Sequence, residues 1–137
     1  LIGIPTLDIV ASAQPLAQMP LVAVLQAGRK RLSVGWYTAE QGRWQATDRL
    51  ENLTLDDFIA AIEEPTWICG ELNASMRKRL GGQESENKNM ILASPAQSLR
   101  RPGYLAALAW QRWKAGDLDD PAALAPHYLH SGEPIPG

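Results

Sequence analysis

The sequence predicts an α/β domain in which helices pack on a mixed five-stranded sheet. Three segments with strand-like patterns follow one another between residues 21 and 50 and form an antiparallel meander. Helical and strand-like patterns then alternate as far as about residue 115. The resulting order, βββαβαβα, combines antiparallel and parallel strands in one sheet and leaves the helices to cover its faces.

The meander is predicted from apolar periodicity. Residues 21–27 are an almost unbroken apolar run, which is typical of a central strand buried on both faces. Residues 32–37 alternate large apolar with smaller or polar side chains, as a strand with one buried face does. We expect residues 28–30 to form the turn between them, with Gly28 providing the permissive backbone. Residues 43–50 alternate more loosely and predict a third strand at the sheet edge.

Two short helices are expected on either side of the meander. Thr6 is the predicted N-cap of the first, and Asp8 in its first turn suits the positive end of the helix dipole. Residues 54–57 resemble a capping box and predict the start of the second. Apolar residues at helical spacing follow over 55–62, and Pro65 ends the run.

The second half of the chain alternates strands and helices. Residues 66–69 and 90–93 are short apolar strands. Asn73 is the predicted N-cap of a basic helix that ends at Leu80. Pro102 suits the first position of a longer helix that runs to about Ala115.

This order of elements is that of the ribonuclease H-like fold, which is also the repeated half-unit of actin-like ATPases and sugar kinases. The chain contains no internal repeat, so we expect it to supply one such half. Residues 1–20 are interpreted as a connecting segment with a short helix, and residues 21–137 as a single domain. Because the sequence starts without methionine, we expect a processed or truncated product.

Composition narrows the classes of function. With 45% apolar and 20% charged residues, the chain has the make-up of a globular domain. Its net charge of −2 gives no support to a dedicated nucleic-acid binder, which is usually basic. No apolar stretch approaches the roughly 20 residues that span a bilayer, so we expect no membrane association. A single cysteine, Cys69, excludes an internal disulfide and favours a reducing, cytoplasmic location.

A hydrolytic site of the ribonuclease H type would need several carboxylates that converge on metal ions from strand ends. The first strand ends in Gln26, a neutral amide, and Glu71 follows the fourth strand. One carboxylate cannot hold two metal ions. We therefore interpret Glu71 as a surface or helix-start residue.

Other cofactor and metal signals are equally weak. The turn at residues 26–31 has one glycine and no hydroxyl residue, unlike loops that cradle phosphates. His127, His130 and Glu133 lie in a proline-rich segment and lack the spacing of zinc proteases. Cys69 is interpreted as a buried core thiol. We predict no catalytic residue, no cofactor and no metal.

Interaction surfaces are the remaining candidates. Arg29 and Lys30 at the turn tip are candidates for contact with nucleic-acid phosphates, although solvated turn residues are the simpler interpretation. Trp110 and Trp113 lie on the apolar face of the last helix, whose first expected role is core packing. We accordingly predict that Leu108→Asp unfolds the domain. The alternative role of this face is an interface, where aromatic residues are enriched.

Four segments, in order and in register, resemble the TsaB family, whose older name is YeaZ: LIGIPTLDIVASAQP, LVAVLQAGRKRLSVGWY, WICGE and LAPHYLH. The residues that match the family's structural motifs are Thr6, Leu7, Gly70, Pro126, Tyr128 and Leu129. Two departures stand out. Gln26-Ala27-Gly28 replaces a common Asp-Ala-Arg, and His130 replaces a closing arginine.

The resemblance implies a role in tRNA modification. The family is the partner subunit for making threonylcarbamoyladenosine at position 37 of tRNA, and its glycoprotease label is considered a misnomer. Its members have two actin-like halves, of which this chain resembles the second. The first half makes the main contact with the catalytic TsaD-type subunit. A TsaE-type ATPase is a further partner, tRNA is reached only indirectly, and no catalytic role is implied for this subunit.

Two alternatives stay open. One is a metal-dependent glycoprotease-like peptidase or a nuclease of the same fold, which would lose its activity in Glu71→Ala or His127→Ala. The other is a free-standing protein-interaction module, with Trp110 and Trp113 as the first surface to test.

Overall fold

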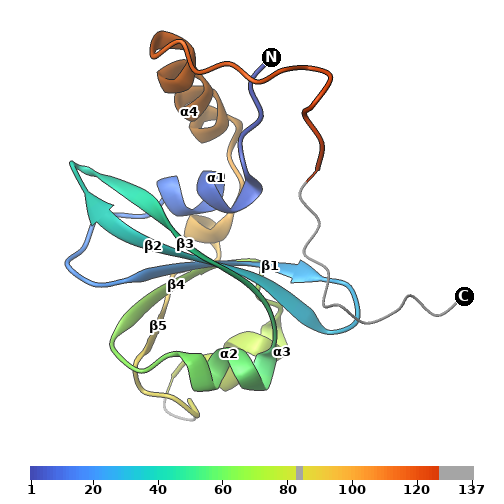
Figure 1. The fold of residues 1–137 in the computed structure, drawn as a ribbon. Coiled ribbons are helices and arrows are strands. Elements are labelled where there is room, and N and C mark those ends of the chain that lie inside the picture. Colours follow the sequence, from blue (N-terminus) through green and yellow to red (C-terminus); the bar gives the residue numbers. More distant parts are fainter. Residues whose placement is uncertain (83–84, 127–137) are drawn as a thin grey trace, which may run out of the picture.

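A five-stranded sheet in the order β3-β2-β1-β4-β5 forms the centre of the computed structural model, which describes residues 1–82 and 85–126 (Figure 1). The strands are β1 (Leu21–Ala27), β2 (Arg31–Glu40), β3 (Arg43–Thr54), β4 (Thr66–Gly70) and β5 (Met90–Leu92). The helices are α1 (Thr6–Ser12), α2 (Leu55–Ala61), α3 (Ala74–Leu80), the short 3₁₀ helix η1 (Ala96–Ser98) and α4 (Pro102–Lys114).

The sheet is mixed, as predicted. β1 pairs antiparallel with β2, and β2 pairs antiparallel with β3, so the meander is confirmed. On its other side β1 pairs parallel with β4, which pairs parallel with β5. The α/β class, the central β1 and the edge position of β3 all follow the sequence prediction.

β1 is buried on both faces because successive side chains point to opposite sides of a strand. Residues 21–24 have no exposed surface. Val22 and Val24 face the core that includes α2, whereas Leu21 and Ala23 face the core that includes α1. The apolar side chains of β1 therefore belong to two separate cores, one on each face of the sheet.

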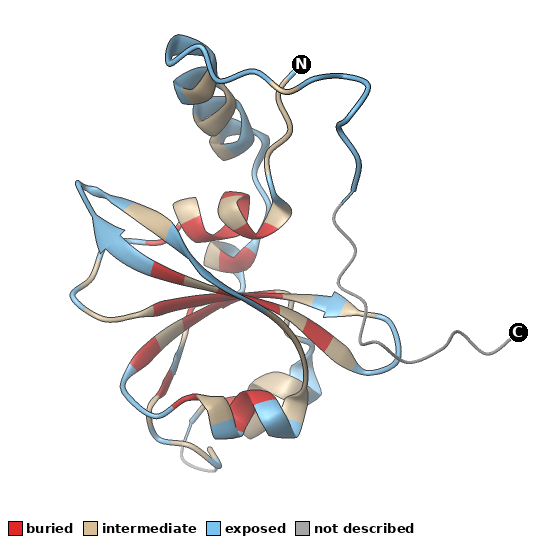
Figure 2. Ribbon diagram, viewed as in Figure 1, coloured by how far each residue is buried: buried red, intermediate tan, exposed pale blue. Residues whose placement is uncertain are grey.

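The helices divide between the two faces of the sheet. α2 and α3 lie together on one face, and α1 and α4 lie on the other (Figure 1). Buried residues are concentrated in the sheet, in α1 and in α2, whereas α4 is half-buried or exposed along its length (Figure 2). The core under α2 and α3 comprises Val22, Val24, Leu32, Val34, Phe58, Ile59, Ile62, Ile68, Leu80 and Met90. The core under α1 comprises Leu7, Val10, Ala11, Leu21, Ala23, Tyr37, Cys69 and Ala93.

Three of the four predicted helix starts are confirmed. Thr54 Oγ1 accepts a hydrogen bond from the backbone N–H of Asp57 at 3.2 Å, and Asn73 Oδ1 accepts one from Met76 at 2.9 Å. Pro102 is the first residue of α4. The prediction for Thr6 is wrong, because Thr6 is already helical and Pro5 occupies the N-cap position without a side-chain cap. Pro5 is extended (φ −57°, ψ 135°), and its carbonyl oxygen accepts the first hydrogen bonds of the helix, from the N–H groups of Asp8 and Ile9.

The turn between β1 and β2 corrects a second expectation. Arg29 (φ +62°) and Lys30 (φ +60°) adopt the left-handed conformation, whereas Gly28 does not. The pairing of Ala27 with Arg31 closes a three-residue loop and sets this geometry. β3 is also longer than predicted, because its pairing with β2 continues as far as Thr54 opposite Arg31.

Gly70 ends β4 close to the backbone of β1. Its φ is +114°, and a Cβ atom there would lie 2.0 Å from the carbonyl oxygen of Val24. The following N–H, that of Glu71, donates to the same oxygen at 2.8 Å. Only glycine can occupy this position without displacing β1.

Gln14 is a buried polar residue that the sequence did not single out. Its Nε2 donates to the carbonyl oxygens of Val10 and Gln97, and its Oε1 accepts from Trp67 Nε1 at 3.1 Å. Its backbone oxygen accepts from Trp44 Nε1 at 3.2 Å. A buried amide with all these partners is well satisfied and fixes the end of α1 on the sheet.

Candidate functional site

A hydrolytic metal site of the ribonuclease H type, which the sequence did not predict for this chain, would lie where β1 and β4 end. The backbone N–H of Gln26 donates to Glu71 Oε2 at 3.2 Å. Arg100 Nη2 donates to Glu71 Oε1 at 2.7 Å. Glu71 thus links Arg100, in the segment before α4, to the backbone of β1. This role is structural. Within residues 1–82 and 85–126, no three His, Cys, Asp or Glu side chains come together in a possible metal site.

The basic residues serve several different purposes. Arg29 and Lys30 are exposed at the tip of the β1–β2 turn. Arg77 donates to the carbonyl oxygens of Leu72 and Ala93 and to Ser98 Oγ, so its guanidinium joins α3 to β5 and η1. Arg77 is therefore a structural residue rather than part of a surface patch.

Arg79 is paired with acidic neighbours. Its Nε lies 2.7 Å from Glu86 Oε1, and its Nη2 lies 2.7 Å from Asp56 Oδ1. The hydrogen bond from Arg79 lowers the pKa of Glu86. These exposed pairs lower the positive potential that α3 offers to an anionic partner.

A cleft that the sequence analysis missed lies between α1, the outer part of β2 and β3, and α4. Its volume is about 420 Å³. α1 and the segment before it supply Ile4, Pro5, Asp8 and Ser12; the strands supply Tyr37, Arg43, Trp44, Gln45 and Ala46; and α4 with the following loop supplies Leu108, Gln111, Arg112, Ala115 and Asp117. The walls of the cleft combine apolar and charged side chains.

A part-buried polar contact in the wall of the cleft joins Asp8 and Tyr37. The Tyr37 hydroxyl donates to Asp8 Oδ1 at 2.6 Å. Burial raises the pKa of Asp8, and the bond from Tyr37 opposes this rise. Burial and the neighbouring carboxylate raise the pKa of Tyr37 as well, so the hydroxyl keeps its proton. Asp8 had been interpreted only as a favourable helix-dipole residue, because its partner lies 29 residues away in sequence.

Arg112 closes the α4 end of the cleft. It donates to both Asp117 and Asp119, at 2.7 and 3.0 Å, and to the Gly3 carbonyl oxygen at 2.7 Å. The Gly3 N–H donates in turn to Asp119 Oδ2 at 2.7 Å. The Arg112 guanidinium lowers the pKa of both aspartates. The network fastens the first residues of the chain to the end of α4.

The hydroxyl and ionisable groups that line the cleft can be compared with those that covalent hydrolysis requires. The Ser12 hydroxyl donates to the Ile9 carbonyl oxygen at 2.9 Å, so it is not activated by Asp8. The residues that line the cleft include no histidine or cysteine. A nucleophile paired with a general base, which covalent hydrolysis requires, is therefore not assembled there.

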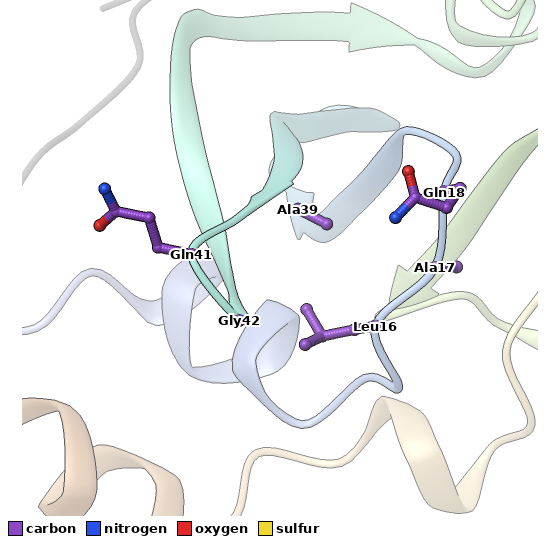
Figure 3. Close-up of a pocket in the computed structure, with 6 residues that line it drawn as sticks. All are labelled: Leu16, Ala17, Gln18, Ala39, Gln41 and Gly42. Atoms are coloured by element: carbon purple, nitrogen blue, oxygen red, sulfur yellow. The ribbon is translucent and has the colours of Figure 1, made fainter.

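A second hollow, of about 310 Å³, lies between the loop before β1 and the β2–β3 turn (Figure 3). Its lining consists of Leu16, Ala17, Gln18, Ala39, Gln41 and Gly42. The Gln41 side chain points away from the hollow, while Leu16 and Ala39 border it (Figure 3). With no ionisable side chain in its lining, this hollow supports no acid–base chemistry.

The predicted packing of α4 into the core is wrong. None of its residues is buried, and Leu108 is only half-buried against the cleft. Trp110 and Trp113 stack on each other with ring centroids 4.8 Å apart, and they are 56% and 55% exposed. Helical periodicity reveals an apolar face but does not say which element covers it, and the described part of the chain leaves this face open.

The remaining predicted residues have varied positions. Leu7 is buried in the core under α1, and Cys69 is fully buried, which raises its pKa to about 12. Pro126 is exposed. The predictions for His127, His130, Tyr128 and Leu129 lie outside the described residues. In the described part of the chain, the helices are too short or too polar to cross a membrane.

The sequence matches no known family model, and no curated protein matches it. Two solved structures from Pseudomonas aeruginosa resemble its fold: an uncharacterized protein with similarity to peptidase YeaZ (18% identity, TM-score 0.65) and YeaZ (16% identity, TM-score 0.64). The matches cover 93% and 92% of this chain, but only 57% of each of those chains. At such identities the likeness establishes the fold alone, which is similar to that of YeaZ.

Proposed function

We propose that this chain is the non-catalytic second half of a TsaB-type partner subunit that is required for threonylcarbamoyladenosine formation on tRNA. The observation that carries the proposal is the YeaZ-like fold across 93% of this chain, matched to 57% of the longer structure. The four sequence segments that resemble the TsaB family support it independently.

The proposed role is to support a partner rather than to perform chemistry. Glu71, at the edge where a related hydrolase would hold metal, is bonded to Arg100 and to the Gln26 N–H. The cleft at Asp8 offers hydrogen bonds and apolar walls without an activated nucleophile. In this proposal the protein acts in the cytoplasm with a TsaD-type catalytic subunit and a TsaE-type ATPase, and it meets tRNA only through them.

The test is nucleoside mass spectrometry of total tRNA from cells depleted of the complete gene product. We expect threonylcarbamoyladenosine to fall by at least tenfold and to return when the gene is restored. A normal level in depleted cells would reject the proposal. A metal-dependent peptidase or nuclease activity of the purified protein that is lost in Glu71→Ala would favour the hydrolase alternative instead.

A further inference from the structure

We propose that the cleft between α1, the outer part of β2 and β3, and α4 binds a small organic cation. The ammonium or guanidinium group of this ligand binds the carboxylate of Asp8, and its apolar body lies among Pro5, Trp44 and Leu108. The volume of the cleft, about 420 Å³, falls within the range of roughly 300–1,000 Å³ in which proteins bind small organic molecules. This site is additional to the proposed role in tRNA modification and does not depend on it.

The Asp8 carboxylate has an unused hydrogen-bond acceptor in the wall of the cleft. Its Oδ1 accepts from the Tyr37 hydroxyl at 2.6 Å. Within residues 1–82 and 85–126 no donor meets its Oδ2, and this oxygen keeps contact with solvent. One neutral partner offsets only part of what a half-buried carboxylate loses in hydration. A cation at Oδ2 supplies a charge-assisted hydrogen bond, about twice as strong as a neutral one.

The guanidinium of Arg112 lines the cleft but has no donor left for an anion. Its five N–H groups make five hydrogen bonds, to the Gly3 carbonyl oxygen and to the carboxylates of Asp117 and Asp119. Two carboxylates against one guanidinium leave one negative charge in excess at this end of the cleft. Asp8 adds a second negative charge, so the potential in the cleft favours a positive ligand.

Arg43 is the other basic residue in the lining. It is exposed at the start of β3, and the side-chain oxygen of Gln45 accepts from its guanidinium. Solvent and salt screen an exposed charge of this kind more than the half-buried charge of Asp8. Arg43 therefore weakens the negative balance of the cleft without reversing it.

Apolar side chains from three parts of the chain supply the rest of the site. Pro5 comes from the segment before α1, Trp44 from β3 and Leu108 from α4. The Trp44 indole N–H donates to the backbone oxygen of Gln14 at 3.2 Å, so the ring is held in place. A fixed aromatic ring and aliphatic side chains bind an apolar body by removing its surface from water.

Binding of 2-phenylethylammonium to the complete gene product, followed by two-dimensional NMR, tests the inference. Neutral 2-phenylethanol and anionic phenylacetate are the matched probes. We expect the cation to bind with a dissociation constant of about 1 mM, at least about tenfold below that of either matched probe. The resonances of Tyr37, Trp44 and Leu108 should shift with the titration.

Four results with these probes would overturn the inference. They are equal affinities for the three compounds, a preference for phenylacetate, shifts confined to residues outside the cleft, and no binding of the cation up to about 20 mM. All four are measured on the unaltered protein, so they do not depend on the folding of a variant.

Asp8→Asn separates the charge of the cleft from its shape. It should weaken binding of the cation by about tenfold and change the affinity for 2-phenylethanol by less than about twofold. The control is Asp56→Asn, which removes an exposed carboxylate from α2 on the other face and should change neither affinity. Cation binding that is as tight in folded Asp8→Asn as in the wild type would contradict the assigned contact.

Leu108→Ala tests the apolar part of the site independently of Asp8. It should weaken the cation and the alcohol alike, by about threefold, because both lose the same apolar contact. An unchanged affinity for both probes would show that the ligand does not lie against α4.

Discussion

The two faces of the sheet are closed to different degrees. On the α2 and α3 face, ten buried residues form one core, and its member Phe58 has no exposed surface. On the other face only α1 packs closely, while α4 leaves a cleft of about 420 Å³ and exposes both of its tryptophans. The closed face holds the larger buried core, and the open face leaves the cleft and α4 accessible to solvent.

The carboxylates of Glu71 and Asp8 are held by two different kinds of polar contact. The carboxylate at the sheet edge, Glu71, is held by an exposed ion pair. The carboxylate on the open face, Asp8, is half-buried and bonded to a buried tyrosine. Burial makes the second contact the stronger determinant of stability, because a buried polar group without a partner is costly.

The largest effect is expected at Gly70, in the strand that both faces share. Gly70→Ala forces a Cβ atom to within 2.0 Å of the Val24 carbonyl oxygen at a φ of +114°. We expect a loss of more than about 4 kcal/mol in the free energy of unfolding, measured in urea, or failure to fold. Gly103→Ala is the control, since a Cβ there meets nothing within 4 Å and should be neutral or mildly stabilising.

The next change compares the two faces directly. Phe58→Ala on the closed face should lower the free energy of unfolding by about 3–5 kcal/mol, because it leaves a cavity in a fully buried core. Leu108→Ala on the open face should cost less than about 1 kcal/mol, since Leu108 is only half-buried. Leu108→Asp should likewise leave a folded protein. Similar costs for Phe58→Ala and Leu108→Ala would show that the open face is as well packed as the closed one.

The Asp8–Tyr37 bond should give an intermediate effect with a defined pH dependence. Asp8→Ala leaves the buried Tyr37 hydroxyl without its partner and should cost about 1–3 kcal/mol. Asp8→Asn keeps an acceptor and should cost less.

The raised pKa of Asp8 sets the sign of the pH effect. Its folded state holds the proton more tightly than the unfolded chain does, so this contribution to stability is full below the ordinary value of 3.8 and is lost as pH rises through the raised pKa. The free energy of unfolding of the wild type, minus that of Asp8→Asn, should therefore fall across this window. A difference that rises with pH would contradict the assigned cause.

The smallest effect is expected at the sheet edge. Glu71→Gln removes the charge that faces Arg100 but keeps an acceptor for the Gln26 N–H, and should cost less than about 1 kcal/mol. Chemical denaturation at low and at high salt measures it. A cost above about 2 kcal/mol that persists at high salt would show that this pair is more important than its exposure suggests.

The sequence was sufficient to predict the structure where residues close together in the chain determine it. The apolar run at residues 21–27 identified the central strand, and Thr54 and Asn73 identified helix starts through their own side-chain oxygens. The turn at residues 28–30 was placed correctly, but the left-handed φ of Arg29 and Lys30 was not predicted, because hairpin closure rather than residue type sets it. Thr6 was misassigned because its cap position falls on Pro5.

Contacts between distant parts of the chain could not be predicted in this way. Tyr37 meets Asp8, and Gln14 meets Trp67, only once the sheet and α1 are packed together. The apolar stripe of α4 was visible in the sequence, but its exposure was not. The cleft and the exposure of α4 on the open face could therefore be seen only in the structure.

The most direct test of a non-catalytic role is the tRNA of cells whose only copy of the gene carries Glu71→Gln together with Asp8→Asn. These changes remove the carboxylate at the ends of β1 and β4 and the carboxylate that Tyr37 contacts in the cleft, while retaining hydrogen-bond acceptors at both positions. The account predicts a normal level of threonylcarbamoyladenosine by nucleoside mass spectrometry. A loss of the modification with the variant protein folded and present at normal abundance would contradict it, because a carboxylate of this chain would then be required for the chemistry.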